Sequence, residues 1–179
     1  FTTSPVCAPS RTSYLSGKST DYTGVFTNTD YIERLGPDRI FRNAFQSIYG
    51  NEVVYTLPEW LKDSGGYYTV GVGKNYHGWL AGGHDNDTDL DQPDKCNRTM
   101  SWSHHYAIDP AEPEPLGASD EWHDGVTGIQ AGPLDNSQEV EMVDYATADS
   151  AIQFLQEYQA NPADFCDRPF FMAVGMFRP

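Results

Sequence analysis

TLPEWLKDSGGYYTVGVGK, residues 56–74, is the stretch that decides the expected fold. Thr56 suits an N-cap, Pro58 suits the first helical turn, and Glu59 stands where a capping box places its acidic partner. These residues predict a short helix that begins after Thr56. Its apolar face is expected to consist of Leu57, Trp60 and Leu61.

A strand is expected directly after this helix. Gly65-Gly66 ends the helix, and residues 67–72 are rich in β-prone side chains that lead into Gly73-Lys74. A helix, a strand and a loop in this order suit an α/β architecture.

A second helix and strand are predicted near the C-terminus. Residues 139–159 carry apolar side chains near helical spacing, and Asn161-Pro162 stops the pattern. The positions expected to face the core are Val143, Ala146, Ala151, Phe154, Leu155 and Tyr158. Residues 170–177 form a short apolar run that predicts a buried strand.

Residues 79–138 are rich in Gly, Pro, Asp and Asn, and they predict a long surface excursion. Its four histidines are read as surface residues rather than as lining of a cleft: His84, His104, His105 and His123. Its tryptophans could stack on sugar rings, but packing of the excursion onto the core is the preferred interpretation for Trp79, Trp102 and Trp122.

Composition narrows the function classes. The chain has 179 residues and a formal net charge of −15, which argues against nonspecific nucleic-acid binding because that needs a basic surface. No stretch approaches the roughly 20 apolar residues of a membrane span. The chain starts at Phe1 and stops at Pro179 without a closing turn, so we interpret residues 1–179 as an interior piece of one domain.

The chain contains three cysteines, Cys7, Cys96 and Cys166. If Cys7 is catalytic, the other two are an even pair that could form a disulfide. Two glycosylation sequons begin at Asn86 and Asn97, and together with such a pair they hint at a secretory route.

The segment Cys7-Ala8-Pro9-Ser10-Arg11 carries the candidate chemistry. A short helix is predicted over residues 10–16, so Cys7 lies near its N-terminus, where the dipole and the free amides stabilise negative charge. Arg11 lies one turn further on and can hold an oxyanion with its planar fork. The alternative is a buried cysteine near a surface arginine. A phosphatase-type loop would need an arginine at position 13, where Ser13 stands.

This segment, followed by Leu15-Ser16-Gly17-Lys18, resembles the signature of type I sulfatases. The resemblance implies that Cys7 is oxidised to formylglycine after translation. It also implies that a formylglycine-generating enzyme reads Cys7, Pro9 and Arg11 during maturation.

Two further segments resemble the same family. Residues 71–78, GVGKNYHG, are similar to its Gly-Lys…His segment, which implies catalytic roles for Lys74 and His77. Two residues between the lysine and the histidine resemble the iduronate-2-sulfatase branch. Residues 169–179 are similar to a strand that in this branch leads to a catalytic histidine. Without these resemblances, Lys74 would be read as a solvated lysine and His77 as a loop histidine.

The resemblance implies an alkaline-phosphatase/sulfatase-like central mixed sheet flanked by helices. It implies hydrolysis of a sulfate ester on a sulfated sugar or polysaccharide, with Ca²⁺ bound by the group at position 7. The paired aspartate ligands are expected before Phe1 and after Pro179, so the piece alone is expected to be inactive.

Three other functions stay open. A phosphonate monoester or phosphodiester hydrolase of the same superfamily can share the motif. A secreted, non-catalytic glycan-binding relative would need no metal ligands. A plain cysteine hydrolase would need Cys7 as a free thiol, which formylglycine is not.

Overall fold

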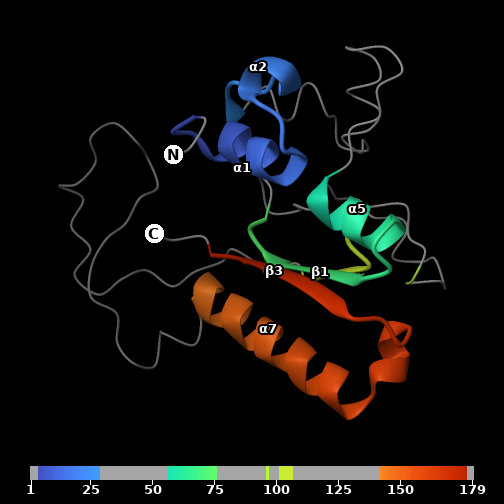
Figure 1. Cartoon of the computed structure of the whole chain (residues 1–179). Helices are drawn as coiled ribbons and strands as arrows, with labels where there is room; N and C mark the ends of the chain where they lie inside the picture. The colour runs from blue at the N-terminus through green and yellow to red at the C-terminus, as the bar shows by residue number, and fades with distance from the viewer. Residues whose placement is uncertain (1–3, 29–55, 76–95, 97–100, 107–141, 177–179) are drawn as a thin grey trace, which may run out of the picture.

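The computed structural model describes residues 4–28, 56–75, 96, 101–106 and 142–176. A small sheet lies at its centre, with helices α1, α2 and α5 toward one face and α7 across the other (Figure 1). This layering is that of an α/β fold, as the sequence predicts.

The sheet has three strands, β1 (Tyr68–Gly73), β2 (His104–Tyr106) and β3 (Phe170–Gly175). Their order is β2-β1-β3, and both pairings are parallel, with Val70 opposite His104 and Met172. No antiparallel pair occurs among these three strands, so the mixed character of the sheet stays a prediction.

The helices follow the predicted order with some shifts. They are α1 (Cys7–Ser16), α2 (Thr20–Thr23), α5 (Leu57–Asp63), α7 (Val143–Ala160) and the 3₁₀ helix η3 (Pro162–Phe165). The first begins at Cys7, three residues before the expected start, so Cys7 is its first residue rather than a residue ahead of it.

Helix α5 confirms the capping box and contradicts the predicted apolar face. The Thr56 hydroxyl accepts from the Glu59 amide, and the Glu59 carboxylate accepts from the Thr56 amide. This reciprocal pair turns Glu59 inward, where it is fully buried together with Lys62. Leu57 and Trp60 therefore lie on the outer side, 46% and 52% exposed.

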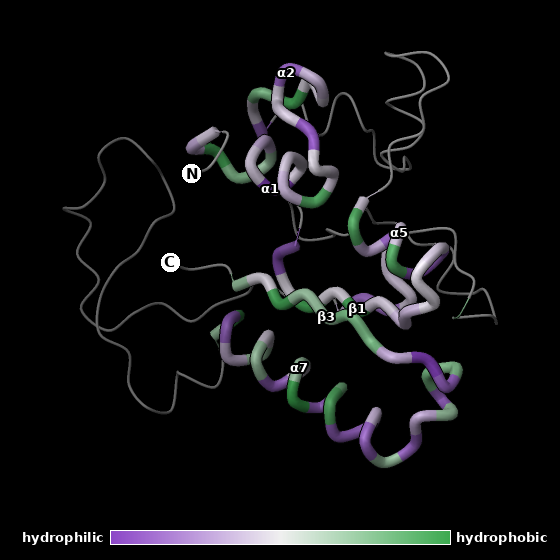
Figure 2. Tube along the Cα trace, viewed as in Figure 1, coloured by the Kyte–Doolittle hydropathy of each residue, from purple (hydrophilic) through white to green (hydrophobic). Residues whose placement is uncertain are grey.

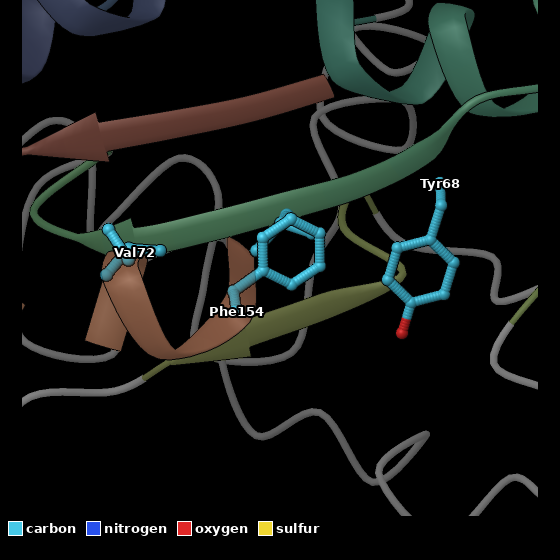
Figure 3. Packing of buried hydrophobic residues seen from close by; sticks show 5 residues of the cluster. Tyr68, Val72 and Phe154 are labelled. Carbon is cyan, nitrogen blue, oxygen red and sulfur yellow. The ribbon is translucent and has the colours of Figure 1, made fainter. Parts of the chain in front are cut away.

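The core lies between β1 and α7. It consists of Tyr68, Val70, Val72, Ala151 and Phe154. The Phe154 ring lies between Val72 and Tyr68, beneath β1 in the view of Figure 3. Hydrophobic positions recur along α7 among hydrophilic ones (Figure 2), as the predicted helical spacing requires.

Two details of the predicted core are wrong. Leu155 is 41% exposed, because it lies one position beyond the buried face of α7 marked by Phe154. Strand β3 is only half-buried, with Val174 at 40% exposure, because it is an edge strand of the described sheet.

The predicted surface excursion contributes to the sheet. Strand β2 lies inside it, so His104 and His105 are half-buried strand residues and not surface ones. Trp102, directly before β2, is 2% exposed, which agrees with packing of the excursion onto the core. His84, His123, Trp79 and Trp122 lie outside the described residues.

A disulfide joins Cys96 to Cys166, with their Cα atoms 6.3 Å apart. The Arg168 guanidinium donates to the Cys96 carbonyl at 2.8 Å, and the Tyr158 hydroxyl donates to the Arg168 carbonyl at 3.0 Å. The excursion is thus tied to the end of α7 just ahead of β3. None of the described helices is long and apolar enough to cross a bilayer.

Candidate active site

Cys7 begins α1, and its helix is capped from a distance. The N-cap residue Val6 has an extended backbone and no side chain that could accept a hydrogen bond. The side chain of Asn28 caps the helix instead, because its oxygen accepts from the Ala8 amide at 3.0 Å. Its amide nitrogen lies 3.9 Å from the Cys7 sulfur. Asn28 therefore holds the helix start and contacts the candidate nucleophile.

Cys7 lies in a hollow of about 460 Å³. The walls come from the segment before α1 and from one face of α1: Ser4, Pro5, Val6, Cys7, Ser10, Arg11 and Tyr14. Cys7 is partly exposed to this hollow and is the free cysteine of the described chain. A small polar group could reach Cys7 from solvent.

The Ser16-Gly17-Lys18 part of the motif closes the other end of α1. Gly17 has φ +67°, the left-handed conformation that ends a helix without a Cβ penalty. The Ser16 hydroxyl donates to the Thr12 carbonyl at 2.6 Å and accepts from the Lys18 amide at 3.3 Å. The Lys18 ammonium lies 4.6 Å from the Tyr22 ring centre. These three residues fix where α1 stops.

Arg11 brings the two predicted motifs together. One guanidinium nitrogen, Nη1, donates to the Lys74 carbonyl and lies 3.4 Å from the Asn75 carbonyl. Lys74 follows β1 and is half-buried. The contact between Arg11 and Lys74 thus runs through the Lys74 backbone. That the Lys74 ammonium reaches the group at position 7 stays a prediction.

The Lys74 backbone is also held from the strand side. Its amide donates to the Gly175 carbonyl at 2.7 Å. Gly73, with φ +66°, lies so close to β3 that an added Cβ would stand 2.5 Å from the Gly175 oxygen. Only glycine allows this approach, and the sequence pattern predicted no more than a loop here.

Asn75 and Tyr14 complete this junction, and the sequence analysis missed both. Asn75 is buried, and its side-chain amide donates to the Val72 carbonyl at 3.1 Å. The Tyr14 hydroxyl donates to the Asn75 carbonyl at 3.2 Å. Tyr14 is seven residues from Cys7, on the side of α1 that carries Arg11, so helical spacing was the signal that could have identified it.

Asn28 left no such signal, since it is 21 residues from Cys7 and stands in an irregular, polar stretch. His77 lies outside the described residues. Of the four predicted catalytic residues, the structure therefore describes Cys7, Arg11 and Lys74.

A calcium site is not completed by the described residues. Calcium takes six to eight oxygen ligands, mostly carboxylates and carbonyls. The walls of the Cys7 hollow carry no carboxylate, and no group of three metal-binding side chains occurs in the part of the chain that the structure describes. These residues alone do not fit a calcium ion.

His105 is the most perturbed histidine of the described part. Burial lowers its pKa to about 4, while a hydrogen bond to the Gly73 backbone acts in the opposite direction. Its ring covers Gly71, where an added Cβ would stand 2.5 Å from it. Its Nε2 has no hydrogen-bond partner among the residues described. His105 is therefore a neutral histidine whose Nε2 is enclosed, although the residue as a whole is half-buried.

Comparison with known proteins adds two findings. The family model described as Sulfatase matches residues 1–176. Iduronate 2-sulfatase from Homo sapiens is 27% identical over 190 residues, which cover the whole chain and 28% of that protein. Iduronate 2-sulfatase from Mus musculus is 26% identical over the same span, 27% of its length. The chain thus spans less than a third of these relatives.

Proposed function

Because the chain belongs to the sulfatase family, we propose that it provides the nucleophile and part of the substrate-binding site of a sulfuric ester hydrolase. The observation that carries the proposal is the junction at which Arg11 joins the Cys7 helix to the Lys74 turn. The names of the relatives favour a sulfated sugar or polysaccharide as substrate. Residues 1–179 are proposed to form part of one larger catalytic domain and to be inactive alone.

The proposed nucleophile is formylglycine at position 7, made from Cys7 by a formylglycine-generating enzyme. The Cys7 sulfur then marks the position of the aldehyde oxygen. Its place at the first residue of α1 supports this role, because helix amides and the dipole favour a nearby oxyanion. The Asn28 amide, 3.9 Å from that sulfur, is a further donor toward this position.

The proposed reaction proceeds through the hydrated aldehyde, which has two hydroxyls. One hydroxyl attacks the sulfur, its oxygen–sulfur bond forms, and the bond from sulfur to the sugar oxygen breaks as that oxygen takes a proton. The second hydroxyl then loses its proton and re-forms the aldehyde, and the bond from carbon to the sulfate oxygen breaks. Water hydrates the aldehyde again, so each cycle consumes one water.

Three side chains are proposed to support these steps. Arg11 orients the group at position 7 and docks α1 on the Lys74 turn. Lys74 binds a sulfate oxygen as a compact cation. His77 accepts the proton of the second hydroxyl.

A Ca²⁺ ion beside position 7 is also proposed, with carboxylate ligands from residues other than those described. Metal analysis of the full-length protein before and after chelation tests this point without reference to turnover. One calcium per protein is expected. A protein free of calcium would contradict it.

A secretory route is proposed for the protein. The disulfide between Cys96 and Cys166 supports it, because disulfides persist in oxidising compartments.

The decisive experiment is mass spectrometry of the Cys7 peptide from the full-length protein expressed with a formylglycine-generating enzyme. We expect a mass about 18 Da below the cysteine form and labelling by a hydrazide probe. Cys7→Ala is the matched control, since it can form no aldehyde. An alkylatable Cys7 thiol, under conditions in which a control sulfatase matures, would contradict the aldehyde mechanism.

Turnover of an aryl sulfate, compared with an aryl phosphonate monoester and a phosphodiester, then tests the substrate class. The aryl sulfate is expected to be hydrolysed fastest. Faster turnover of either phosphorus ester would assign the other hydrolase class. A matured protein that turns over none of the three would point to the glycan-binding alternative.

A further inference from the structure

Tyr14 has an exposed ring and an engaged hydroxyl. Its side chain is 58% exposed and lines the hollow that contains Cys7 and Arg11. The hydroxyl nevertheless donates to the Asn75 carbonyl at 3.2 Å, across the space between α1 and the end of β1. An exposed tyrosine is usually free to change rotamer, so this bond defines one orientation of the ring.

The Asn75 carbonyl receives both of its described donors from α1. Both contacts are long for their kind, with Arg11 Nη1 at 3.4 Å and the Tyr14 hydroxyl at 3.2 Å. The Tyr14 hydroxyl is the nearer donor. The same Arg11 nitrogen already donates to the Lys74 carbonyl, so the Tyr14 bond is the main hold on the next peptide group.

The strand side of this turn is held independently of Tyr14. The Lys74 amide donates to Gly175, and the buried Asn75 side chain donates to Val72. What α1 adds is the orientation of the two carbonyls, at Lys74 and Asn75. The Lys74 carbonyl belongs to the peptide group that links Lys74 to Asn75, and the Asn75 carbonyl belongs to the next peptide group. Together they determine how the chain continues after Lys74.

We propose that Tyr14 is a positioning residue for the Lys74 turn, acting through the Asn75 carbonyl. The inference rests on the proposed function, in which Lys74 binds the sulfate group. Loss of the hydroxyl leaves the Asn75 carbonyl with only the long contact to Arg11. The peptide group that follows Asn75 can then rotate, which loosens the turn on the C-terminal side of Lys74 and lets the ammonium move away from the sulfate position. A misplacement of about 1 Å can reduce a catalysed rate about 100-fold.

The test compares three variants of the matured full-length protein. Tyr14→Phe removes only the hydroxyl, and Tyr14→Leu removes the ring as well. Tyr145→Phe is the matched control, because Tyr145 is also an exposed tyrosine, 45% exposed, and lies on α7 across the sheet. Aldehyde content, Tm, kcat and KM for an aryl sulfate are measured for each protein, together with hydrogen exchange of the peptide that contains residues 73–77.

We expect Tyr14→Phe to lower kcat about 10-fold or more while KM changes less than about twofold. Aldehyde content should equal that of the wild type, and Tm should fall by no more than about 2 °C. Amides of residues 73–77 should exchange faster in Tyr14→Phe. Tyr145→Phe should match the wild type in every measurement.

A Tyr14→Phe protein with wild-type kcat and wild-type exchange would overturn the proposal. A rise in KM seen only in Tyr14→Leu would instead assign the ring to direct contact with the substrate. If the wild type forms an aldehyde but hydrolyses no sulfate ester, the proposed function fails. Hydrogen exchange then still decides whether Tyr14 holds the turn, because that measurement needs no turnover.

Discussion

At the scale of single residues, the Lys74 backbone is held at both its amide and its carbonyl. Its amide is held by Gly175 and its carbonyl by Arg11. Both residues are distant from Lys74 in the sequence, and although Arg11 belongs to the Cys7 motif, that motif does not indicate a contact with Lys74. This is why the resemblance could identify Lys74 while the contacts around it became visible only in the structure.

Replacing Arg11 by lysine tests this arrangement. A guanidinium can approach two neighbouring carbonyls with one planar group, whereas an ammonium is a single point charge. Arg11→Lys should therefore lower kcat/KM for an aryl sulfate about 10-fold or more per aldehyde-bearing protein, a reference that is needed because Arg11 is also expected to be read during maturation. Arg168→Lys is the matched control, since Arg168 also donates to a backbone carbonyl, that of Cys96. Equal activity of the two variants would contradict the role of Arg11.

His105 predicts how stability depends on pH. Burial holds its pKa at about 4 in the folded protein, against 6.5 in the unfolded chain. The contribution of His105 to the free energy of unfolding is fully present above pH 6.5 and is lost toward pH 4. In this window only the unfolded chain takes up the proton. The free energy of unfolding should fall by about 2–3 kcal/mol between pH 7 and pH 4.5 from this group.

Urea unfolding at the two pH values checks the prediction. His105→Gln cannot take up the proton. Its free energy of unfolding should therefore fall less between pH 7 and pH 4.5, by about 2–3 kcal/mol. His104→Gln is the matched control, because His104 is the adjacent histidine of the same strand, on its opposite face. An unchanged loss in His105→Gln would show that other groups cause the dependence.

At the scale of elements, the close contact between the ends of β1 and β3 depends on glycine. Gly73→Ala introduces both backbone strain and a Cβ 2.5 Å from the Gly175 oxygen. Gly17→Ala has the same kind of positive φ, but its Cβ would meet nothing within 4 Å. Comparing the two variants therefore separates the cost of backbone strain from the cost of steric overlap with β3.

Gly17→Ala should cost about 1 kcal/mol, from the left-handed backbone alone. Gly73→Ala should cost about 1–3 kcal/mol more, because the overlap adds to the strain. Denaturant unfolding of both variants measures the difference. Equal losses in the two variants would show that β3 can move away at no cost.

Elements with local signals could be predicted from the sequence, and those that depend on a partner could not. The start of α5 is encoded by its own capping residues, so it was predicted correctly. Its exposed and buried faces were not, because the inward turn of Glu59 follows from the hydrogen bonds of that cap. Strand β2 is three residues long and is defined by pairing with β1, which a stretch rich in Gly, Pro and Asp does not reveal.

At the scale of the whole molecule, the disulfide ties the stretch that contains β2 to the chain ahead of β3. Three cysteines allow three pairings, so the sequence predicts the pair Cys96–Cys166 only if Cys7 is catalytic. The site shows the same division between local and distant signals. Cys7 and Arg11 lie in one short motif, whereas Asn28, Tyr14 and Gly175 became partners only through folding.

Breaking the disulfide should lower the free energy of unfolding by about 2–4 kcal/mol, because the link closes a long loop. A reducing agent is expected to lower the Tm of the wild type. It should leave the Tm of a variant with both Cys96→Ser and Cys166→Ser unchanged, since that variant has no link to break. A reductant effect of equal size in both proteins would have to come from somewhere other than this disulfide.

A ribosome makes Lys74 roughly 100 residues before it makes Gly175, whose carbonyl holds the Lys74 amide. At about 5–20 residues per second, the growing chain spends on the order of 5–20 s with both Cys7 and Lys74 made and this anchor still missing. During that interval the Lys74 turn, which Arg11 of α1 contacts, lacks its hold from β3. The enzyme proposed to oxidise Cys7 therefore has several seconds during synthesis in which to act, before the strand that completes the Lys74 turn has been made.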